Sequence, residues 1–236
     1  MDRDRNERIV LITGASRGIG AALAHRFAAE GAHLVLVART VGGLEEVDDA
    51  VHAASGRHAT LVPLDLTDFA AIDRLGGVLF ERFGRVDVVI GNAAMLGTLS
   101  PMHHIEPETW EAVIALNLTA NWRLIRSFDP LLRRSEAGRA IFLTTAVAET
   151  PVAYWGAYAV SKAALEMMVR IYAAEVANTA IRVNLFDPGA VRTRMRTQAF
   201  PGEEPSDRPA PEAVVDPVIA LAGPDCTRNG EVVRAS

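Results

Sequence analysis

Residues 8–20 read Arg-Ile-Val-Leu-Ile-Thr-Gly-Ala-Ser-Arg-Gly-Ile-Gly, an apolar run followed by a turn rich in glycine. The apolar, β-branched run is typical of a buried strand, and apolar residues at helical spacing begin at about Gly18. Glycines permit the tight turn from strand to helix, and the helix N-terminus offers free amides and a positive dipole end to a phosphate. This segment therefore predicts an α/β sheet whose first turn binds a nucleotide.

The rest of the chain repeats this alternation of strand and helix. The first helical pattern covers 19–30, and another covers 44–54. Further apolar runs predict strands at 33–38, 59–64, 86–91, 139–145, 181–186 and 231–234. Because the runs are continuously apolar, helices should cover both faces of the sheet. We therefore predict a Rossmann-type doubly wound parallel sheet of about seven strands, formed by residues 1–236 as a single domain. Four prolines at 200–211 interrupt the last strand–helix unit, and we expect a substrate lid at about 194–211.

The composition limits the classes of protein and partner. Of the 236 residues, 50% are hydrophobic and 22% charged, which suffices for a core and excludes a disordered or collagen-like chain. The net charge of −5 argues against nucleic acid as a partner, and the single cysteine, Cys226, excludes an intrachain disulfide and a Cys-rich zinc site. Neither a secretory signal nor an apolar run of about 18 residues is present. We expect a soluble, cytoplasmic protein with no membrane partner and no bound metal.

Two arginines near the glycine turn bear on the choice of nucleotide. In a dinucleotide fold, an acidic residue at the end of the second strand holds the adenosine ribose hydroxyls. This chain has Ala38 and Arg39 there. An acid would repel a 2′-phosphate, whereas Arg39 and Arg17 can form charge-assisted contacts with it. We therefore expect NADP(H) to be favoured over NAD(H); the alternative is that both arginines lie on a solvated rim.

Lys162 is the only lysine among 24 basic residues, and it follows Tyr158 by four positions. Four residues apart on a helix, the two side chains share a face, so the ammonium can approach the phenol. A nearby cation would lower the pKa of Tyr158 from about 10 toward about 7 or 8. Tyr158 could then exchange a proton with a carbonyl or an alcohol while a hydride moves to or from a nicotinamide. The alternative is an ordinary helix whose lysine extends to solvent.

Together these residues resemble the short-chain dehydrogenase/reductase family from about residue 8 to residue 193. The most specific match is the motif Tyr158-Ala-Val-Ser-Lys162. The resemblance implies that Lys162 binds the nicotinamide ribose and lowers the tyrosine pKa, and that Asn117 positions a water in a proton relay. It also implies that Thr145 stands where the family has a catalytic serine. The catalytic set would be Tyr158, Lys162, Thr145 and Asn117.

The resemblance further implies a cofactor site built from the loops that follow the strands. The residues of this site match four motifs of the family: the glycine turn, the acid after the third strand, the Asn-Ala-Gly after the fourth strand and the Pro-Gly-x-Val-x-Thr. The expected cofactor-binding residues are Gly14, Ser16, Arg17, Gly18, Ile19, Gly20, Arg39, Asp65, Leu66, Asn92, Ala93, Ala94, Tyr158, Lys162, Pro188, Gly189, Val191 and Thr193.

Three departures from the family pattern bear on activity and assembly. Thr145 has the same hydrogen-bonding capacity as serine, but its β-branch restricts χ1, so it must point inward to polarise a carbonyl. Ala94 replaces a glycine beside the cofactor and adds a methyl group there. The tail at 230–236 lacks the family's Asp-Gly-Gly, a region that often helps to build its tetramer. We expect a homodimer or homotetramer.

The residues that flank the catalytic positions are mostly apolar and suit an uncharged carbonyl compound or alcohol as the small-molecule substrate. Three arginines at 192, 194 and 196 would favour an anionic substrate instead, although alternate spacing after a strand is more typical of a solvated face. The expected substrate-binding residues are Ala146, Val147, Tyr154, Trp155 and Met195, with Ala190 and Phe200 as further candidates.

The leading hypothesis is an NADP-dependent oxidoreductase that interconverts a ketone or aldehyde and its alcohol, with Tyr158 as general acid/base. The main alternative is a catalytically impaired NAD(P)-binding sensor or regulatory protein of the same fold, which Thr145 and Ala94 would favour. A methyltransferase on a similar sheet would explain the glycine turn but gives no role to Tyr158 and Lys162.

Overall fold

Seven parallel strands form one sheet in the order β3-β2-β1-β4-β5-β6-β7 in the computed structural model, which describes residues 7–235. Every neighbouring pair is parallel, so each connection is a crossover, and the sheet matches the predicted fold class. The strands are β1 (Ile9–Thr13), β2 (His33–Ala38), β3 (Thr60–Pro63), β4 (Val88–Gly91), β5 (Arg139–Leu143), β6 (Arg182–Asp187) and β7 (Val232–Arg234).

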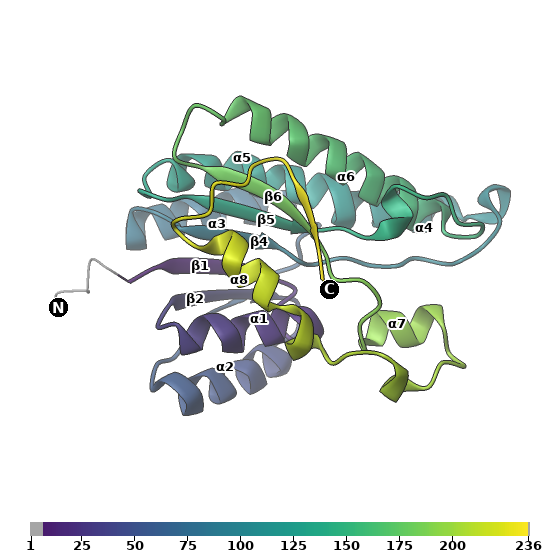
Figure 1. Cartoon of the computed structure of the whole chain (residues 1–236), viewed down its shortest axis with the longest axis horizontal. Coiled ribbons are helices and arrows are strands. Elements are labelled where there is room, and N and C mark those ends of the chain that lie inside the picture. The colour runs from purple at the N-terminus through teal and green to yellow at the C-terminus, as the bar shows by residue number, and fades with distance from the viewer. Residues whose placement is uncertain (1–6, 236) are drawn as a thin grey trace.

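Helices cover both faces of the sheet, as Figure 1 shows. One hydrophobic cluster lies under α1, α2 and α8, and a second lies under α3, α5 and α6. The helices are α1 (Gly18–Ala29), α2 (Val41–Ser55), α3 (Phe69–Phe83), α4 (Pro107–Ile114), α5 (Ala120–Leu132), α6 (Gly156–Glu175), α7 (Arg194–Ala199) and α8 (Asp216–Ala222). Helical turns connect them: η1 (Met102–His104), η2 (Ala115–Thr119), η3 (Ala146–Ala148), η4 (Pro205–Asp207) and η5 (Pro211–Val214).

The predicted strands are confirmed in number and order, with bounds that differ by up to two residues. The fourth strand begins at Val88, and the carboxylate of Asp87, the residue before it, accepts the backbone amide of Ile9 at 2.8 Å. The fifth ends at Leu143, because the chain turns into η3 directly after Thr145.

The position of the site follows from the order of the strands. The chain runs outward from β1 to β3 and then returns to the other side of β1 with β4. Crevices at such a switch point, outside the carboxyl ends of the strands, are where ligands bind in open α/β sheets. The turns that follow β1, β4, β5 and β6 all emerge at this edge.

The segment predicted as a lid is partly helical. Residues 194–211 contain α7 and η4, although the prolines suggested an irregular loop. Thr193 caps α7, because its hydroxyl accepts the amide of Arg196 at 3.2 Å. Within the described part of the chain, no helix is both long and apolar enough to cross a membrane.

Candidate active site

The turn between β1 and α1 leaves its backbone open to a ligand. Gly14 and Gly18 adopt φ angles of +65° and +56°, which other residues rarely adopt. A Cβ at Gly20 would lie 2.3 Å from the carbonyl oxygen of Gly14, so the turn closes only around a glycine. Arg17 precedes α1 and its side chain makes no capping hydrogen bond, so the first helix amides have no side-chain acceptor. The turn fits a dinucleotide diphosphate, and contacts from Ser16 and Ile19 stay predictions.

Asn92 braces this turn from the neighbouring strand. Its side-chain amide donates to the carbonyl oxygens of Thr13, at 2.8 Å, and Gly14, at 3.2 Å. The Thr13 hydroxyl donates to the carbonyl of Ile90 and accepts the amides of Asn92 and Ala93 at 3.0 and 3.1 Å. Asn92 therefore positions the turn with both of its amide protons engaged. Sequence reasoning missed Thr13, which its place at the end of the first strand could have indicated.

Arg39 and Asp65 follow the neighbouring strands β2 and β3. The guanidinium of Arg39 is 70% exposed, and its Nη1 lies 3.9 Å from Oδ2 of Asp65. Asp65 accepts the amide and hydroxyl of Thr67 at 2.9 and 2.7 Å, and the amide hydrogen bond is the main reason that its pKa is lowered. Leu66 beside it is buried. The structure thus brings Arg39 and Asp65 together at the edge where an adenosine would lie.

A π-helical turn, η2, places Asn117 between two parts of the site. Such turns within α-helices often occur at functional positions. The Asn117 side chain is fully buried; it accepts the amide of Met95 and donates to its carbonyl, both at 2.9 Å. It also donates to the Ser161 hydroxyl on α6 at 3.0 Å. Asn117 therefore ties the segment after β4, which contains Ala94, to the helix that carries Tyr158.

Tyr158 and Lys162 lie one turn apart on α6 and are 8% and 2% exposed. The Lys162 ammonium donates to the carbonyl of Leu143 at 2.7 Å and lies 5.9 Å from the centre of the Tyr158 ring. Burial lowers the pKa of Lys162 to about 8, against the opposing effect of Glu166. Burial raises the pKa of Tyr158, and the Asp187 carboxylate raises it further. The lowered pKa expected for Tyr158 is therefore wrong for this structure, because burial and the Asp187 carboxylate both disfavour the phenolate.

Thr145 follows β5 in extended backbone conformation and precedes η3, which packs against α6. It is half-buried, and its carbonyl accepts the amide of Ala148 at 3.0 Å. The structure therefore places the predicted catalytic threonine at the same sheet edge as the carbonyl that receives Lys162.

The segment after β6 closes the site against the glycine turn. Gly189, at φ +67°, donates its amide to Oδ1 of Asp187 at 2.9 Å. A Cβ at Gly18 would lie 3.6 Å from the methyl group of Thr193, so the turn and this segment are neighbours. Val191 is buried, and Pro188 is half-buried. The residues predicted from the Pro-Gly-x-Val-x-Thr motif are thus brought beside the first turn.

Aromatic side chains gather on the substrate side. The ring centre of Trp155 lies 6.0 Å from that of Tyr158 and 5.9 Å from that of Phe200, beyond α7. Tyr154 has a φ of +74°, the one positive value of a non-glycine residue within 7–235, and its carbonyl accepts the amide of Ser100 at 3.0 Å. Its side chain is 61% exposed, so the structure does not enclose it as a pocket residue. Ala146 is exposed, whereas Val147, Ala190 and Met195 are half-buried.

Arg196 belongs to neither a free anion site nor a solvated face. Its guanidinium donates to both carboxylate oxygens of Glu203 at 2.5 and 2.7 Å and lies 3.8 Å from the centre of the Phe200 ring. Arg208 donates to Glu203 at 2.7 Å, and the hydrogen bond from Arg196 is the main reason that the pKa of Glu203 falls to about 2. Arg192 and Arg194 are exposed. The ion pairs thus hold together α7 and the segment around η4.

Comparison with known proteins identifies the family to which this arrangement belongs. The sequence model of the family described as short chain dehydrogenase matches residues 8–204. The chain belongs to the short-chain dehydrogenase family. It is therefore an oxidoreductase of the type that binds a nicotinamide cofactor.

Relatives of this short-chain dehydrogenase match almost its whole length. It is 36% identical over 226 residues to the uncharacterized oxidoreductase YciK of Escherichia coli (strain K12), which covers 95% of this chain and 89% of the relative. A solved short chain dehydrogenase from Salmonella enterica serovar Typhi superposes with a TM-score of 0.95 at 33% identity and covers 100% of both chains. A structure from Shigella flexneri 2a, solved in complex with NADP, superposes with a TM-score of 0.94 at 34% identity and covers 97% of each chain.

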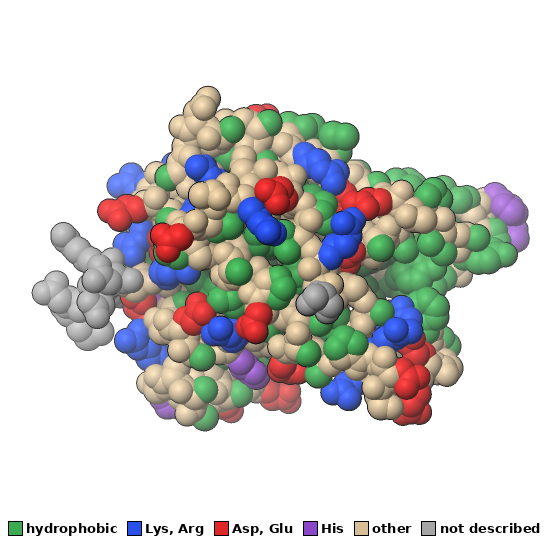
Figure 2. Space-filling view, in the orientation of Figure 1, with side chains coloured by type: hydrophobic (Ala, Val, Ile, Leu, Met, Phe, Trp, Pro, Cys, Tyr) green, Lys and Arg blue, Asp and Glu red, His purple; other side chains and the backbone are tan. Residues whose placement is uncertain are grey.

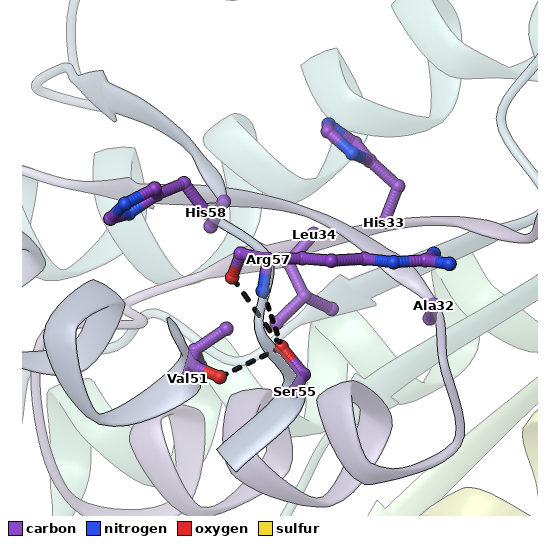
Figure 3. A pocket seen from close by; sticks show the side chains of 8 residues that line it. Ala32, His33, Leu34, Val51, Ser55, Arg57 and His58 are labelled. Carbon is purple, nitrogen blue, oxygen red and sulfur yellow. Dashed lines mark hydrogen bonds between the residues drawn. The ribbon is translucent and has the colours of Figure 1, made fainter. Parts of the chain in front are cut away.

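A small cavity of this dehydrogenase, drawn in Figure 3, lies at the opposite edge of the sheet. Residues from the beginning of β2, from the end of α2 and from the loop before β3 line it, and Ser55 donates to the carbonyl of Val51 beside it at 2.8 Å. Its volume of about 10 Å³ leaves room for at most a single water, so it is no substrate site.

Sequence reasoning missed three buried polar residues around the predicted catalytic positions of the dehydrogenase: Thr144, Glu166 and Asp187. Their roles depend on contacts between segments far apart in the chain. Only Glu166 left a local signal, because it follows Lys162 by four positions on the same helix face.

Proposed function

We propose that this short-chain dehydrogenase uses NADP(H) to interconvert a ketone or aldehyde and the corresponding alcohol, with Tyr158 as general acid/base. The observation that carries the proposal is the burial of Tyr158 beside the chain's only lysine, at the edge of the sheet where the glycine turn lies. Burying a phenol and an ammonium costs free energy that apolar side chains would not cost, which favours a functional reason for the pair.

The cofactor would be held by the glycine turn, by Asp65 and Arg39 at its adenosine end and by Lys162 at its nicotinamide end. When bound, the nicotinamide supplies or accepts the hydride. The exposed guanidinium of Arg39 supports NADP(H), because it offers a positive charge where a 2′-phosphate would lie. The NADP in the related Shigella flexneri structure supports the same choice.

The electrostatics of the site keep Tyr158 in the protonated form that a proton donor needs. Because burial and Asp187 raise its pKa, the phenol is protonated at neutral pH and can give a proton to a carbonyl oxygen. The Lys162 ammonium would stabilise the phenolate that remains. A hydroxyl donor at Thr145 would polarise the same oxygen, and Asn117 would hold the segment that connects the site to the helix.

The substrate would be an uncharged, largely apolar carbonyl compound. Trp155 and Phe200 offer aromatic faces beside Tyr158. Hydrophobic side chains also gather over the part of the molecule that projects to the right in Figure 2, near the loop that precedes α4. Met102, in the turn η1 before α4, is 58% exposed and lies against Gly156, directly after Trp155. Because Arg196 is engaged by Glu203, its charge is satisfied without an anionic substrate.

Tyr158→Phe tests this function. Binding of NADPH is followed by fluorescence, and turnover is measured on a panel of ketones, aldehydes and quinones. The variant should lose turnover and keep NADPH affinity within about threefold. Tyr172→Phe is the matched control, because Tyr172 is a second buried tyrosine on α6 whose hydroxyl donates to Asp129 at 2.9 Å. Turnover retained by Tyr158→Phe would exclude the proposed acid, whereas NADPH binding without turnover in the wild type would favour the sensor.

Two further expectations accompany the activity. The side chains of Val160, Met167 and Ile171 share one face of α6 and are 42%, 59% and 52% exposed, which supports a homodimer or homotetramer formed through this helix. Sedimentation of the wild type against Met167→Glu would test it, since the variant should sediment as a monomer. A cytoplasmic location remains a prediction from the single cysteine.

A further inference from the structure

Glu166 is a buried carboxylate directly behind the catalytic residues, and the proposed chemistry leaves it without a task. It is 3% exposed and lies on α6 one turn after Lys162. Its Oε1 accepts the Thr144 hydroxyl at 2.6 Å, and its Oε2 accepts a guanidinium nitrogen of Arg170 at 2.9 Å. A carboxylate buried to this extent lowers stability unless its hydrogen bonds and counter-charges compensate for the lost hydration. We therefore expect Glu166 to have a function, which its contacts indicate.

The first consequence of Glu166 is the position of the corner that ends β5. Three successive residues form this corner: the carbonyl of Leu143 accepts the Lys162 ammonium at 2.7 Å, Thr144 donates to Glu166, and Thr145 follows. The amide of Thr144 also bonds to the carbonyl of Phe186 on β6 at 2.8 Å. The side-chain hydrogen bond from Thr144 therefore fixes the residue that precedes Thr145 from the helix side.

The second consequence is electrostatic. Lys162, Glu166 and Arg170 succeed one another at intervals of four on α6, so a negative charge lies between two positive ones. The Arg170 side chain is 40% exposed, so water partly screens its charge, whereas Lys162 is 2% exposed. Glu166 pairs directly with Arg170 and also acts on the more deeply buried Lys162, whose pKa it raises against the effect of burial.

Few other ionisable groups surround the ammonium. Tyr158 lies on the same helix, and Asp187 at the end of β6 acts on Tyr158. The turns η2 and η3, which also pack against α6, carry no ionisable side chain, and both glutamates of α4 are exposed.

We propose that Glu166 is a positioning residue of this active site: it holds Thr144 so that Thr145 is placed beside Tyr158, and it is the counter-charge of the Lys162 ammonium. The proposal rests on the function proposed above for Thr145, Tyr158 and Lys162. It predicts two separable effects. The pKa of Lys162 depends on the charge of residue 166, and kcat depends on the hydroxyl of residue 144.

The single lysine makes the charge effect measurable without a substrate. Protein labelled with ¹³C,¹⁵N-lysine gives one side-chain NMR signal, that of Lys162, which is titrated against pH. We expect the wild-type signal to titrate near pH 8. Glu166→Gln, which keeps an acceptor for Thr144 but loses the charge, should titrate roughly one pH unit lower. An unchanged titration would overturn the counter-charge role.

Thr144→Val separates the second effect. It removes the hydrogen bond and keeps the Glu166 charge, so the Lys162 titration should stay within about 0.3 units while kcat falls at least about tenfold with NADPH affinity unchanged. Wild-type kcat in this variant would overturn the placement of Thr145 by Glu166. If Glu166→Gln does not fold, Arg170→Met carries the charge test: loss of the second cation should move the Lys162 titration upward, and no movement would overturn the proposal.

Failure of this inference is distinguishable from failure of the proposed function. The lysine titration reports on Glu166 whether or not a substrate is known. If the titrations shift as expected while the wild type neither binds NADPH nor reduces a carbonyl, the proposed function is wrong and the charge role of Glu166 stands.

Discussion

At the scale of single residues, Arg39 is the side chain whose charge we expect to distinguish the two nicotinamide cofactors. Its guanidinium is exposed and lies 3.9 Å from Asp65, so it is available to a phosphate. Arg39→Asp should weaken NADPH binding by about ten- to a hundredfold and strengthen NADH binding, because the new carboxylate repels a 2′-phosphate and can bind ribose hydroxyls. Fluorescence titration with both cofactors measures the change. Arg57→Asp, at the opposite edge of the sheet, is the control, and an unchanged preference in Arg39→Asp would show that another group binds the phosphate.

A second prediction at this scale concerns stability and pH. The folded-state pKa of Lys162, about 8, is below its ordinary value of 10.5. Between these values the unfolded chain binds more protons, so a rise in pH through this window favours the folded state. Relative to Lys162→Met, the free energy of unfolding of the wild type should rise by about 1–3 kcal/mol from pH 8 to pH 10.5. Urea unfolding at several pH values measures it, and tyrosine ionisation cancels because both proteins share it. A constant difference between the two proteins would contradict the buried ammonium.

At the scale of elements, a clamp of three charged side chains holds the segment predicted as a lid. Glu203 joins Arg196 on α7 to Arg208 after η4. Glu203→Gln should therefore increase hydrogen exchange of the amides in residues 194–208 at neutral pH. The pKa of Glu203 is lowered to about 2, so the clamp is intact above about pH 4.5 and is lost as pH falls through about 2. Hydrogen-exchange mass spectrometry measures this, with Glu204→Gln as the matched control, since no ion pair of Glu204 occurs within residues 7–235. Equal exchange in the two variants would show that the clamp does not hold the lid.

The elements also show what the sequence could predict. The strand–turn–helix at 9–29 was predictable because its apolar periodicity and its glycines act locally, and the six other strands followed from the same pattern. The helix α7 in the segment predicted as a lid was not predictable. It begins after the cap Thr193, but the prolines nearby indicated a loop. The raised pKa of Tyr158 and the contact between Thr144 and Glu166 depend on which segments pack together, and spacing within one segment does not contain that information.

At the scale of the whole molecule, the two edges of the sheet have separate tasks: the carboxyl edge carries the site, and the amino edge is closed by Arg139. Its guanidinium is 3% exposed and donates to the carbonyls of Ala180, Gly223 and Pro224, so it joins β5 to the segment after α8. No carboxylate within residues 7–235 forms an ion pair with it, and burial lowers its pKa.

Arg139→Met should destabilise the protein without a change in cofactor binding. Loss of the guanidinium leaves several buried carbonyls without a donor, so the free energy of unfolding should fall by about 2–4 kcal/mol. The matched control is Arg182→Met: Arg182 pairs in register with Arg139 on the next strand but donates only to the nearby carbonyls of Thr179 and Ile181. Its loss should cost below about 1 kcal/mol, because no distant segment is released. Urea unfolding and NADPH titration of both variants measure the two effects. Since the amino edge does not contribute to the site, a variant that lost stability and NADPH affinity together would show that the two edges are coupled.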